Sequence, residues 1–345
     1  MAESKISLEI ILGNSNKRFS GVTSTMLQVL PYQQRQAQVS VLGHHHLPAD
    51  VPSLTFFQAI VKLRKKAPKG IKRVFHARRN DEMIQALLLK KVFRCKFKIV
   101  FTSTAQREKT WITKWLMKQM DGLITTCSAA AHYMPTPPDI VVPHGIDPNL
   151  YSPDKPYTNR VPFENSIGIF GRVRAQKGVD LFVEALLEVL PEYPAWGGVI
   201  VGEITVEQKA FQKSLESQLK SKGLQGRVLF TDKVPFNQLA DYFLSVDIVC
   251  ALSINEGFGL TVLEALSSGK PVVATKAGAW PDIITPDMGR LIEVGDKAAL
   301  VQALGEIMSN PELRSSMATQ GRELILDRYT VSREADQLIS FYQYV

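Results

Sequence analysis

The stretch E-G-F-G-L-T-V-L-E at residues 256–264, followed by A-L-S-S-G-K-P-V-V-A-T at 265–275, decides the fold. An apolar run at 246–252 precedes it and is typical of a buried strand. The E-G-F-G turn then opens a helix, and residues 271–274 resume a strand. The pattern therefore predicts a strand, turn, helix and strand in succession, which is the repeating unit of a parallel α/β sheet.

The composition of this turn indicates a ligand site. Its two glycines let the backbone approach a ligand closely, and the free amides at the helix start suit a phosphate. Glu256 lies in the turn, whereas Glu264 falls about one helical turn beyond Leu260 and Thr261, so both carboxylates can face one ligand. A sugar nucleotide suits this turn, because the amides can bind its diphosphate and the carboxylates can accept hydrogen bonds from its hydroxyls. The alternative is an ordinary βαβ crossover with two solvated glutamates.

Length and composition favour two α/β domains of ordinary size. The chain has 345 residues, of which 45% are hydrophobic. No apolar run is long enough to span a bilayer, and residues 1–12 lack the pattern of a signal peptide, so we expect a cytoplasmic protein. The three cysteines are far apart and not in metal-ligand spacing, which predicts buried thiols in a reducing compartment and neither a disulfide nor a zinc site: Cys95, Cys127 and Cys250.

The net charge of +8 conceals an asymmetry between the two halves of the chain. Residues 1–160 hold 24 basic and 10 acidic residues, a net of +14, whereas the remainder holds 17 basic and 23 acidic residues, a net of −6. This separation indicates an anionic partner for the first half only, either a nucleic acid or an anionic membrane surface.

Three segments of the first half carry candidate functional residues. A predicted strand at 6–12 leads into a polar loop that contains Gly21. Loops that follow the carboxyl ends of strands commonly bind ligands in α/β sheets. A short strand from Val74 places His76 at the same edge of the sheet. Tryptophans and lysines alternate along a predicted helix around 111–118, which can lie on a membrane interface or pack into the core.

The second half begins after a stretch without periodicity at 148–162, where Pro, Asp, Asn and Tyr dominate. A strand at 166–170 follows, then G-R-V-R-A-Q-K-G at 171–178 and an amphipathic helix. We therefore predict one domain at 1–155 and another at 156–329.

The two glutamates in the setting E-G-F-G-L-x-x-L-E-A, followed by G-K-P-V-V-A-T, resemble the nucleotide-sugar site of family-4 retaining glycosyltransferases of the GT-B type. The resemblance implies an α/β fold of two Rossmann-like domains that face a central cleft. Residues 1–155 would bind the acceptor and 156–329 the sugar-nucleotide donor. In this architecture a last helix, at about 330–345, crosses back onto the first domain.

The resemblance also implies roles for individual residues. The sugar hydroxyls would be held by Glu256, the donor ribose by Glu264, and the diphosphate by Arg172 and Lys177. Histidine at position 76 would lie beside the transferred sugar, which completes the catalytic set His76, Glu256, Arg172 and Lys177. The expected donor-binding residues are Gly21, Phe258, Gly259, Leu260, Thr261, Glu264 and Val234. The expected acceptor-binding residues are Lys17, Arg18, Arg78, Arg79 and Arg107, with solvated bases as the alternative reading.

Three further motifs, R-F-S-G-V-T-S-T, H-A-R-R-N and T-A-Q-R, look most like the lipopolysaccharide-core mannosyltransferases of Gram-negative bacteria. These enzymes pass mannose from GDP-mannose to a Kdo sugar on a lipid A precursor. The resemblance implies a nucleotide-sugar donor, no metal or other cofactor, an anionic glycolipid acceptor, peripheral contact with the inner face of the inner membrane, and no nucleic acid. The alternatives are a hexosyltransferase that uses a UDP- or ADP-sugar, and a nucleic-acid- or sugar-nucleotide-binding protein without catalysis.

Overall fold

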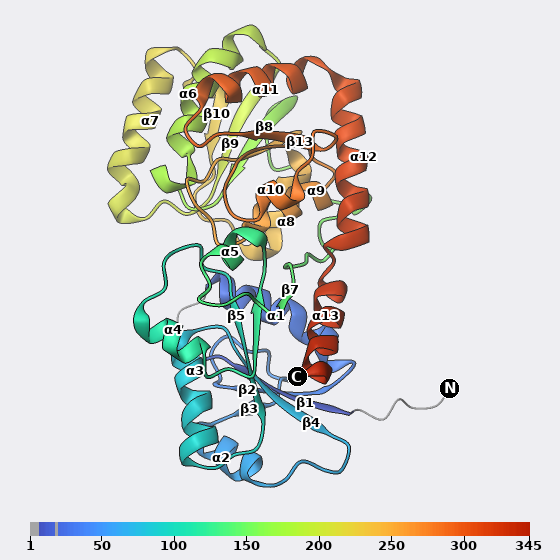
Figure 1. Ribbon diagram of the computed structural model, residues 1–345. Helices are drawn as coiled ribbons and strands as arrows, with labels where there is room; N and C mark the ends of the chain where they lie inside the picture. Colours follow the sequence, from blue (N-terminus) through green and yellow to red (C-terminus); the bar gives the residue numbers. More distant parts are fainter. Residues whose placement is uncertain (1–6, 18–19) are drawn as a thin grey trace. The chain divides into compact units, whose positions relative to one another are not determined.

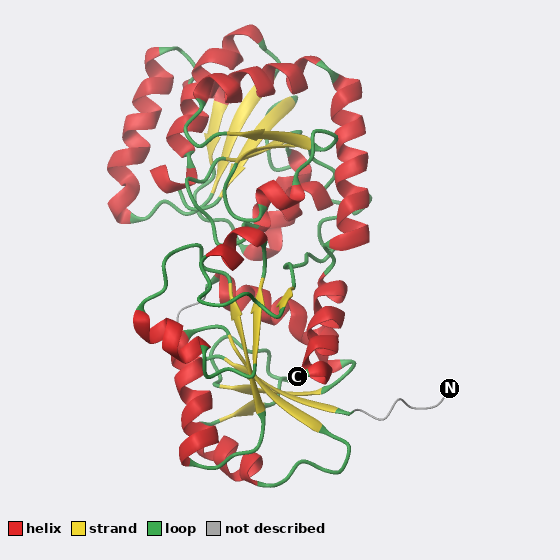
Figure 2. Ribbon diagram, in the orientation of Figure 1, coloured by secondary structure: helices red, strands yellow, loops and turns green. Residues whose placement is uncertain are grey.

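The computed structural model describes residues 7–17 and 20–345 and divides the chain into two compact units. Unit 1 takes the chain up to Gly145 together with Val331–Val345, and unit 2 is Ile146–Thr330. Each unit is a parallel sheet with helices on both faces (Figures 1 and 2). The chain thus has the predicted α/β class with two Rossmann-like sheets.

Unit 1 contains a seven-stranded parallel sheet in the order β3-β2-β1-β4-β5-β6-β7. The strands are β1 (Leu8–Gly13), β2 (Gln38–Leu42), β3 (Ser53–Leu54), β4 (Lys72–Ala77), β5 (Lys98–Ser103), β6 (Gly122–Thr125) and β7 (Ile140–Val141). The helices are α1 (Gly21–Gln34), α2 (Phe56–Arg64), α3 (Asn80–Leu87) with its π-helical continuation η1 (Leu88–Val92), α4 (Trp111–Met117), α5 (Ser128–His132) and α13 (Val331–Tyr344).

Alternation along the strands assigns each helix of unit 1 to one face of the sheet. Ile10 and Leu12 of β1 lie in one core cluster with α1 and α13, whereas Ile11 lies in the other with α2, α3 and α4. Successive side chains of a strand point to opposite faces, so the apolar runs fill both cores.

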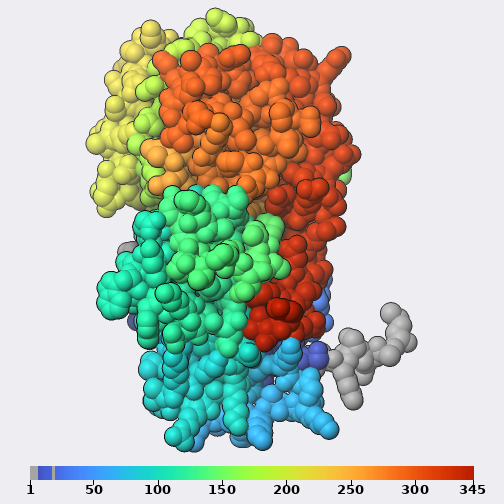
Figure 3. Space-filling model, viewed as in Figure 1, coloured from blue at the N-terminus to red at the C-terminus, as the bar shows by residue number. Residues whose placement is uncertain are grey.

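The C-terminal helix α13 is fixed to unit 1 by buried polar contacts. The Glu334 carboxylate lies 2.9 Å from Nδ1 of His144 and accepts the backbone N–H of Gly145 at 2.8 Å. The Tyr342 hydroxyl lies 2.6 Å from Nδ1 of His76. In Figure 3 this helix, in dark red, lies against the green and blue segments of unit 1. Residues from the two ends of the sequence therefore share one core.

Unit 2 contains a six-stranded parallel sheet in the order β10-β9-β8-β11-β12-β13. The strands are β8 (Asn165–Phe170), β9 (Trp196–Val201), β10 (Val228–Phe230), β11 (Ile248–Ala251), β12 (Val272–Thr275) and β13 (Gly289–Ile292). The helices are α6 (Val179–Val189), α7 (Lys209–Ser221), α8 (Phe236–Ser245), α9 (Leu260–Ser267), α10 (Trp280–Ile283), α11 (Lys297–Ser309) and α12 (Pro311–Arg328), with short 3-10 turns η2 (Ala175–Lys177), η3 (Leu190–Glu192), η4 (Val206–Gln208) and η5 (Gln225–Arg227). The predicted central unit is β11, α9 and β12.

The strand orders place a topological switch point in each sheet. Strand order reverses between β1 and β4 in unit 1 and between β8 and β11 in unit 2. Loops that leave the carboxyl ends of strands at such a point diverge and leave a crevice, where ligands bind in open α/β sheets. The loops after these four strands are therefore the expected positions of functional residues.

The predicted domain boundary at 155/156 lies inside unit 2 and not between the units. Tyr151 is only 1% exposed, and its ring centroid lies 5.6 Å from that of Phe243 on α8. Arg160 forms an ion pair with Asp241 of the same helix at 3.0 Å. The segment 148–162 has the composition of a linker, but its aromatic and basic side chains pack onto unit 2, so the boundary moves to 145/146.

Loss of the Glu334 carboxylate should release α13. We expect Glu334→Ala to destabilise unit 1 by about 2–4 kcal/mol, because it leaves a buried N–H group and His144 without their acceptor. Hydrogen-exchange mass spectrometry should show faster exchange in α13 than in unit 2. Gln337→Ala, at an exposed position of the same helix, is the matched control. Unchanged exchange in α13 of the Glu334 variant would show that apolar packing alone holds this helix.

Candidate functional site

The loops after β8 and β9 approach each other closely at the switch point of unit 2. Gly171 and Gly202 have φ of +132° and +155°. A Cβ atom on Gly202 would lie 1.9 Å from the carbonyl oxygen of Gly171, which no side chain tolerates. These two glycines therefore let two strand exits meet backbone to backbone.

An ion pair between Lys177 and Glu256 joins the loop after β8 to the loop after β11. Ser253 also donates to the Glu256 carboxylate, at 2.8 Å. Gly178, with φ of +70°, ends the turn that carries Lys177, and a Cβ there would lie 2.2 Å from the carbonyl oxygen of Leu252. The predicted pair of catalytic residues is thus brought into contact across the switch point.

A cavity of about 270 Å³ opens beside this ion pair. Five of the predicted residues line it, namely Arg172, Lys177, Val234, Thr261 and Glu264. The remaining lining residues are Phe170, Gly171, Val201, Gly202, Glu203, Lys233, Leu239 and Phe243. Two predicted cations and one predicted carboxylate therefore face the same space, which can hold an anion and hydroxyl groups together.

The Glu264 carboxyl on α9 is held away from solvent. Burial raises its pKa to about 7, although the hydroxyl of Tyr151 donates to it at 3.0 Å and Lys177 favours its charged form. Near neutral pH the carboxyl therefore exists in both protonation states, and a ligand that donates hydrogen bonds to it favours the charged one.

The turn at the start of α9 is shaped by a tryptophan whose role sequence reasoning missed. Gly259 has φ of +88°, and a Cβ there would lie 2.3 Å from Nε1 of Trp280, which donates to the Gly259 carbonyl at 2.9 Å. Phe258 is buried at 5% exposure. The predicted donor residues Phe258, Gly259 and Leu260 do not line the cavity of unit 2, so within this unit they set the shape of the turn.

A buried carboxylate organises the switch point of unit 1. Glu82 of α3 is fully buried; it accepts the backbone N–H of Arg78 at 2.7 Å and Nη1 of Arg79 at 2.9 Å. A Cβ on Gly13, at the end of β1, would lie 2.9 Å from the Glu82 side chain, so glycine makes room for it. No feature of the local sequence distinguishes this glutamate from the solvated ones.

The predicted acceptor residues Arg78, Arg79 and Arg107 all line a cavity of about 510 Å³ but differ in their partners. Arg79 also donates to Ser20 and Thr23 at 2.9 and 3.0 Å, so its guanidinium is engaged inside the protein and positions the start of α1. Among the described residues, Nη1 of Arg78 is buried without a hydrogen-bond partner, so Arg78 is better placed than Arg79 to bind an anion in this cavity.

The structure does not present His76 to a ligand. Its side chain is 1% exposed, with Nε2 at 2.7 Å from the Thr102 hydroxyl and Nδ1 at 2.6 Å from that of Tyr342. Burial, followed by the charge of Arg78, holds its pKa well below the usual value, so the ring is neutral. Within unit 1 Tyr342 of α13 covers the ring, and the expectation that His76 lies beside the transferred sugar stays a prediction.

The remaining predicted residues of unit 1 lie at the start of α1 and in the loop before it. Lys17 is exposed, and its carbonyl lies 2.8 Å from Nε2 of His46. Gly21 is the first residue of α1, and a Cβ there would meet open space. Arg18 lies outside the described residues. Neither Lys17 nor Gly21 lines the cavity that contains Arg78.

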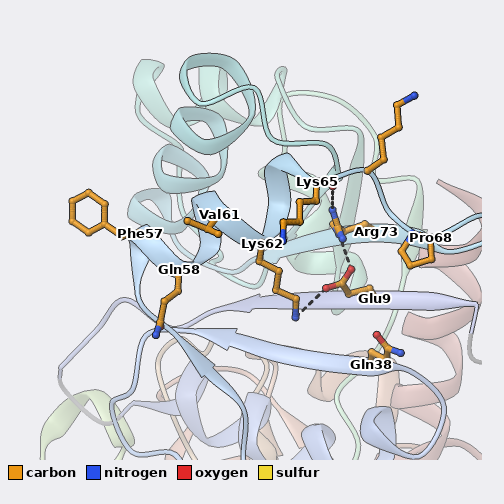
Figure 4. Close-up of a pocket in the computed structure, with 10 residues that line it drawn as sticks. Glu9, Gln38, Phe57, Gln58, Val61, Lys62, Lys65, Pro68 and Arg73 are labelled. Atoms are coloured by element: carbon orange, nitrogen blue, oxygen red, sulfur yellow. Dashed lines mark hydrogen bonds and ion pairs between the residues drawn. The ribbon is translucent and has the colours of Figure 1, made fainter.

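Another cavity of unit 1, of about 710 Å³, lies at the opposite edge of the sheet (Figure 4). It adjoins the amino ends of β1, β2 and β4 and the helix α2. Glu9 in its wall forms ion pairs with Lys62 at 3.0 Å and with Arg73 at 2.6 Å. Because these two cations are already neutralised and the cavity is remote from the switch point, we do not assign it to the reaction.

The described residues offer neither a cluster of metal ligands nor a helix that could span a membrane. They contain no group of three or more His, Cys, Asp or Glu residues that could hold a metal ion. Over the same part of the chain no helix is both long and apolar enough to cross a bilayer. The three cysteines are buried, as predicted.

Known proteins resemble this chain in sequence and in fold. Residues 158–324 match the family described as glycosyl transferases group 1. The chain is 36% identical to the lipopolysaccharide core biosynthesis mannosyltransferase LpcC of Rhizobium leguminosarum, over 97% of this chain and 96% of that protein. It is also 36% identical to the enzyme of that description, LpsB, from Rhizobium meliloti, over 97% of both chains.

The similarity in structure extends over both units. The crystal structure of HepE from Anabaena matches 99% of this chain and 100% of its own with a TM-score of 0.79 at 16% identity, which shows the fold alone. The paired parallel sheets are accordingly those of the GT-B architecture. The relatives of 36% identity extend over nearly the whole chain, and with the family match over unit 2 they establish that this chain belongs to the glycosyl transferases group 1 family and is a glycosyltransferase.

Proposed function

We propose that this glycosyltransferase moves mannose, with retention of configuration, from GDP-mannose to a Kdo sugar of a lipopolysaccharide core precursor carried on lipid A. The proposal is supported by the two 36%-identical relatives, whose descriptions are core mannosyltransferases. The structural observation that carries it is the cavity of unit 2, where Arg172 and Lys177 face the same space as Glu264.

The cations of this cavity suit the departure of a nucleoside diphosphate. As the bond between sugar and phosphate breaks, negative charge grows on the diphosphate, and preorganised cations lower the energy of that state. Arg172 and Lys177 supply this charge in our mechanism, so no divalent metal is needed. Lys177 is already oriented by Glu256 and requires little rearrangement.

Both glutamates act as hydrogen-bond acceptors in the mechanism that we propose. Glu256 accepts from hydroxyls of the transferred sugar, and Glu264 accepts from the ribose. The departing phosphate takes the proton of the acceptor hydroxyl, which arrives on the face that the diphosphate leaves. Neither carboxylate forms a covalent bond to the sugar.

The carboxylate of Glu203 supports guanine as the base of the nucleotide. Glu203 lines the cavity next to Val234 and lies 3.9 Å from the ammonium of Lys233. The edge of guanine carries two neighbouring donors, N1–H and N2–H, which a carboxylate can accept together. Uracil offers one N–H donor and adenine only its amino group, so this acceptor favours GDP.

Arg78 supports an anionic acceptor. Its unpartnered Nη1 and the side chains of Arg107 and Lys109 belong to the cavity of unit 1. A guanidinium binds a carboxylate or phosphate with paired hydrogen bonds, and Kdo carries a carboxylate. Because this acceptor is anchored by lipid A, we propose that the enzyme works in the cytoplasm at the inner face of the inner membrane.

Thermal denaturation in EDTA tests the donor. GDP and GDP-mannose should raise the melting temperature, since a ligand at 100 times its Kd adds about 2.7 kcal/mol to the stability of the folded state. UDP and ADP should shift it much less. A larger shift with UDP or ADP would overturn the donor, and no shift with any nucleotide would remove the ligand that we propose for this cavity.

The pH dependence of stability tests the state of Glu264. Because its pKa in the folded protein is about 7, above its usual 4.5, the folded state holds the proton more tightly than the unfolded state. The contribution of this group to stability is therefore full below about pH 4.5 and is lost as pH rises to about 7, by at most about 3 kcal/mol.

Glu264→Gln should abolish that loss, so the variant should be more stable than the parent protein at pH 8 and should bind GDP more weakly. Glu323→Gln, at an exposed site of unit 2, is the control. Urea unfolding of unit 2 between pH 5 and 8 measures the effect. If Glu264→Gln is destabilising at pH 8, burial does not disfavour the ionised carboxylate there, contrary to our description.

A further inference from the structure

Helix α4 turns an apolar face outward. Trp111, Ile112 and Trp115 are 77%, 46% and 53% exposed, whereas Leu116 and Met117 of the same helix are buried in the core. The two tryptophans are one helical turn apart and so lie on the same side. Such a cluster of large exposed apolar side chains marks a contact surface and not a solvated helix face. The alternative that these tryptophans pack into the core is therefore wrong.

The chain around this face is strongly basic. Residues 88–121, from η1 through α4, hold nine Lys and Arg residues against two acidic ones. Lys114 lies between the two tryptophans, with its ammonium 3.3 Å from the exposed Glu108 carboxylate, and Lys118 follows the last residue of the helix. Cations that border an apolar face complement an anionic lipid surface, where lysines meet headgroups and tryptophans enter the boundary with the acyl chains.

Helix α4 also adjoins the cavity that we assign to the acceptor. The loop that lines this cavity with Arg107 and Lys109 runs directly into the helix, and the N-cap Thr110 and Thr113 of α4 belong to the same wall. Asn80 donates to the Thr113 hydroxyl at 2.8 Å, which fixes α4 to the start of α3 beside Arg78. The apolar face therefore starts where the binding cavity ends.

We propose that the surface formed by Trp111, Ile112, Trp115, Lys114 and Lys118 docks unit 1 onto a bilayer of anionic phospholipids. It would hold the cavity of Arg78 at the height of the headgroups, where the sugars of a lipid-anchored acceptor lie. This inference rests on the proposed function, which supplies the lipid-borne acceptor.

Helix α2 carries the competing surface and provides the matched control. Phe57 is 78% exposed and Val61 64%, similar to the tryptophans of α4. However, the neighbouring Lys62 and Arg73 are paired with Glu9, and this surface adjoins the cavity at the opposite edge of the sheet (Figure 4). We expect it to contribute little to lipid binding.

Flotation of the full-length protein with vesicles tests the proposal. Vesicles of phosphatidylglycerol and phosphatidylcholine should bind the protein, and pure phosphatidylcholine should bind it weakly. The double variant Trp111→Ser/Trp115→Ser should lower the partition coefficient at least about tenfold. Lys114→Gln and Lys118→Gln should each lower it about fivefold, with weaker effects at high salt. Phe57→Ser should leave it unchanged.

Tryptophan fluorescence gives a second readout that reports α4 directly. Of the four tryptophans, Trp196 and Trp280 are buried at 6% and 1% exposure. Vesicles should therefore shift the emission of Trp111 and Trp115 to the blue, and brominated lipids should quench it. No shift, or a loss of flotation with Phe57→Ser and not with the α4 variant, would overturn the proposal.

Two further results separate this proposal from the function on which it rests. If the α4 variant changes the oligomeric state without lipid and the parent protein does not float, the face is a protein interface and the proposal fails. The GDP-induced rise in melting temperature should be the same in the α4 variant and in the parent protein. Normal vesicle binding without any nucleotide-induced shift would contradict the donor and leave the docking surface intact.

Discussion

The ion pair between Lys177 and Glu256 is the interaction on which the candidate donor site depends. In a parallel sheet the loops after β8 and β11 leave the same edge and diverge at the switch point. One backbone hydrogen bond joins them, from the N–H of Ile254 to the carbonyl of Gln176 at 2.9 Å. The salt bridge, with a hydroxyl donor from Ser253, adds a side-chain link at the ligand side of these loops. It also leaves a cation and a carboxylate at the edge of the crevice. The cation can bind a phosphate there, and the carboxylate can accept hydrogen bonds from sugar hydroxyls.

At the switch point of unit 1 an ion pair between Glu82 and Arg79 also holds the chain in place, but this pair is buried. Glu82 is buried and satisfied by Arg79 and by the backbone of the loop after β4. Removing a charge from water is unfavourable unless it is paired, so Arg79 is committed to the structure. Arg78, the next residue back, is left with an unpartnered nitrogen. One arginine thus positions the loop, and the other is available for an anion.

Local sequence patterns predicted most of the elements. The family resemblance indicated five of the residues that line the cavity of unit 2, which lie in loops after strands or in the helix that follows. Sequence patterns did not predict features that depend on residues distant in sequence. Tyr151 belongs to unit 2 because it packs on α8 and donates to Glu264, although its surroundings have the composition of a linker. The contact of Tyr342 with His76 joins residues far apart in the chain. Trp280 donates a hydrogen bond to the Gly259 carbonyl, and no sequence periodicity relates these two positions.

Mannose transfer itself is the measurement that tests the account most directly. GDP-mannose and a Kdo-bearing lipid A precursor would be incubated with the enzyme in EDTA, and the lipid products resolved by mass spectrometry and anomeric analysis. We predict the addition of one hexose in the α configuration of the donor. Lys177→Met should reduce turnover about 10²–10³-fold, since it removes one preorganised charge, whereas Lys276→Met at an exposed site should not. Transfer that needs an added metal, or a fully active Lys177 variant, would contradict the role that we assign to this cation.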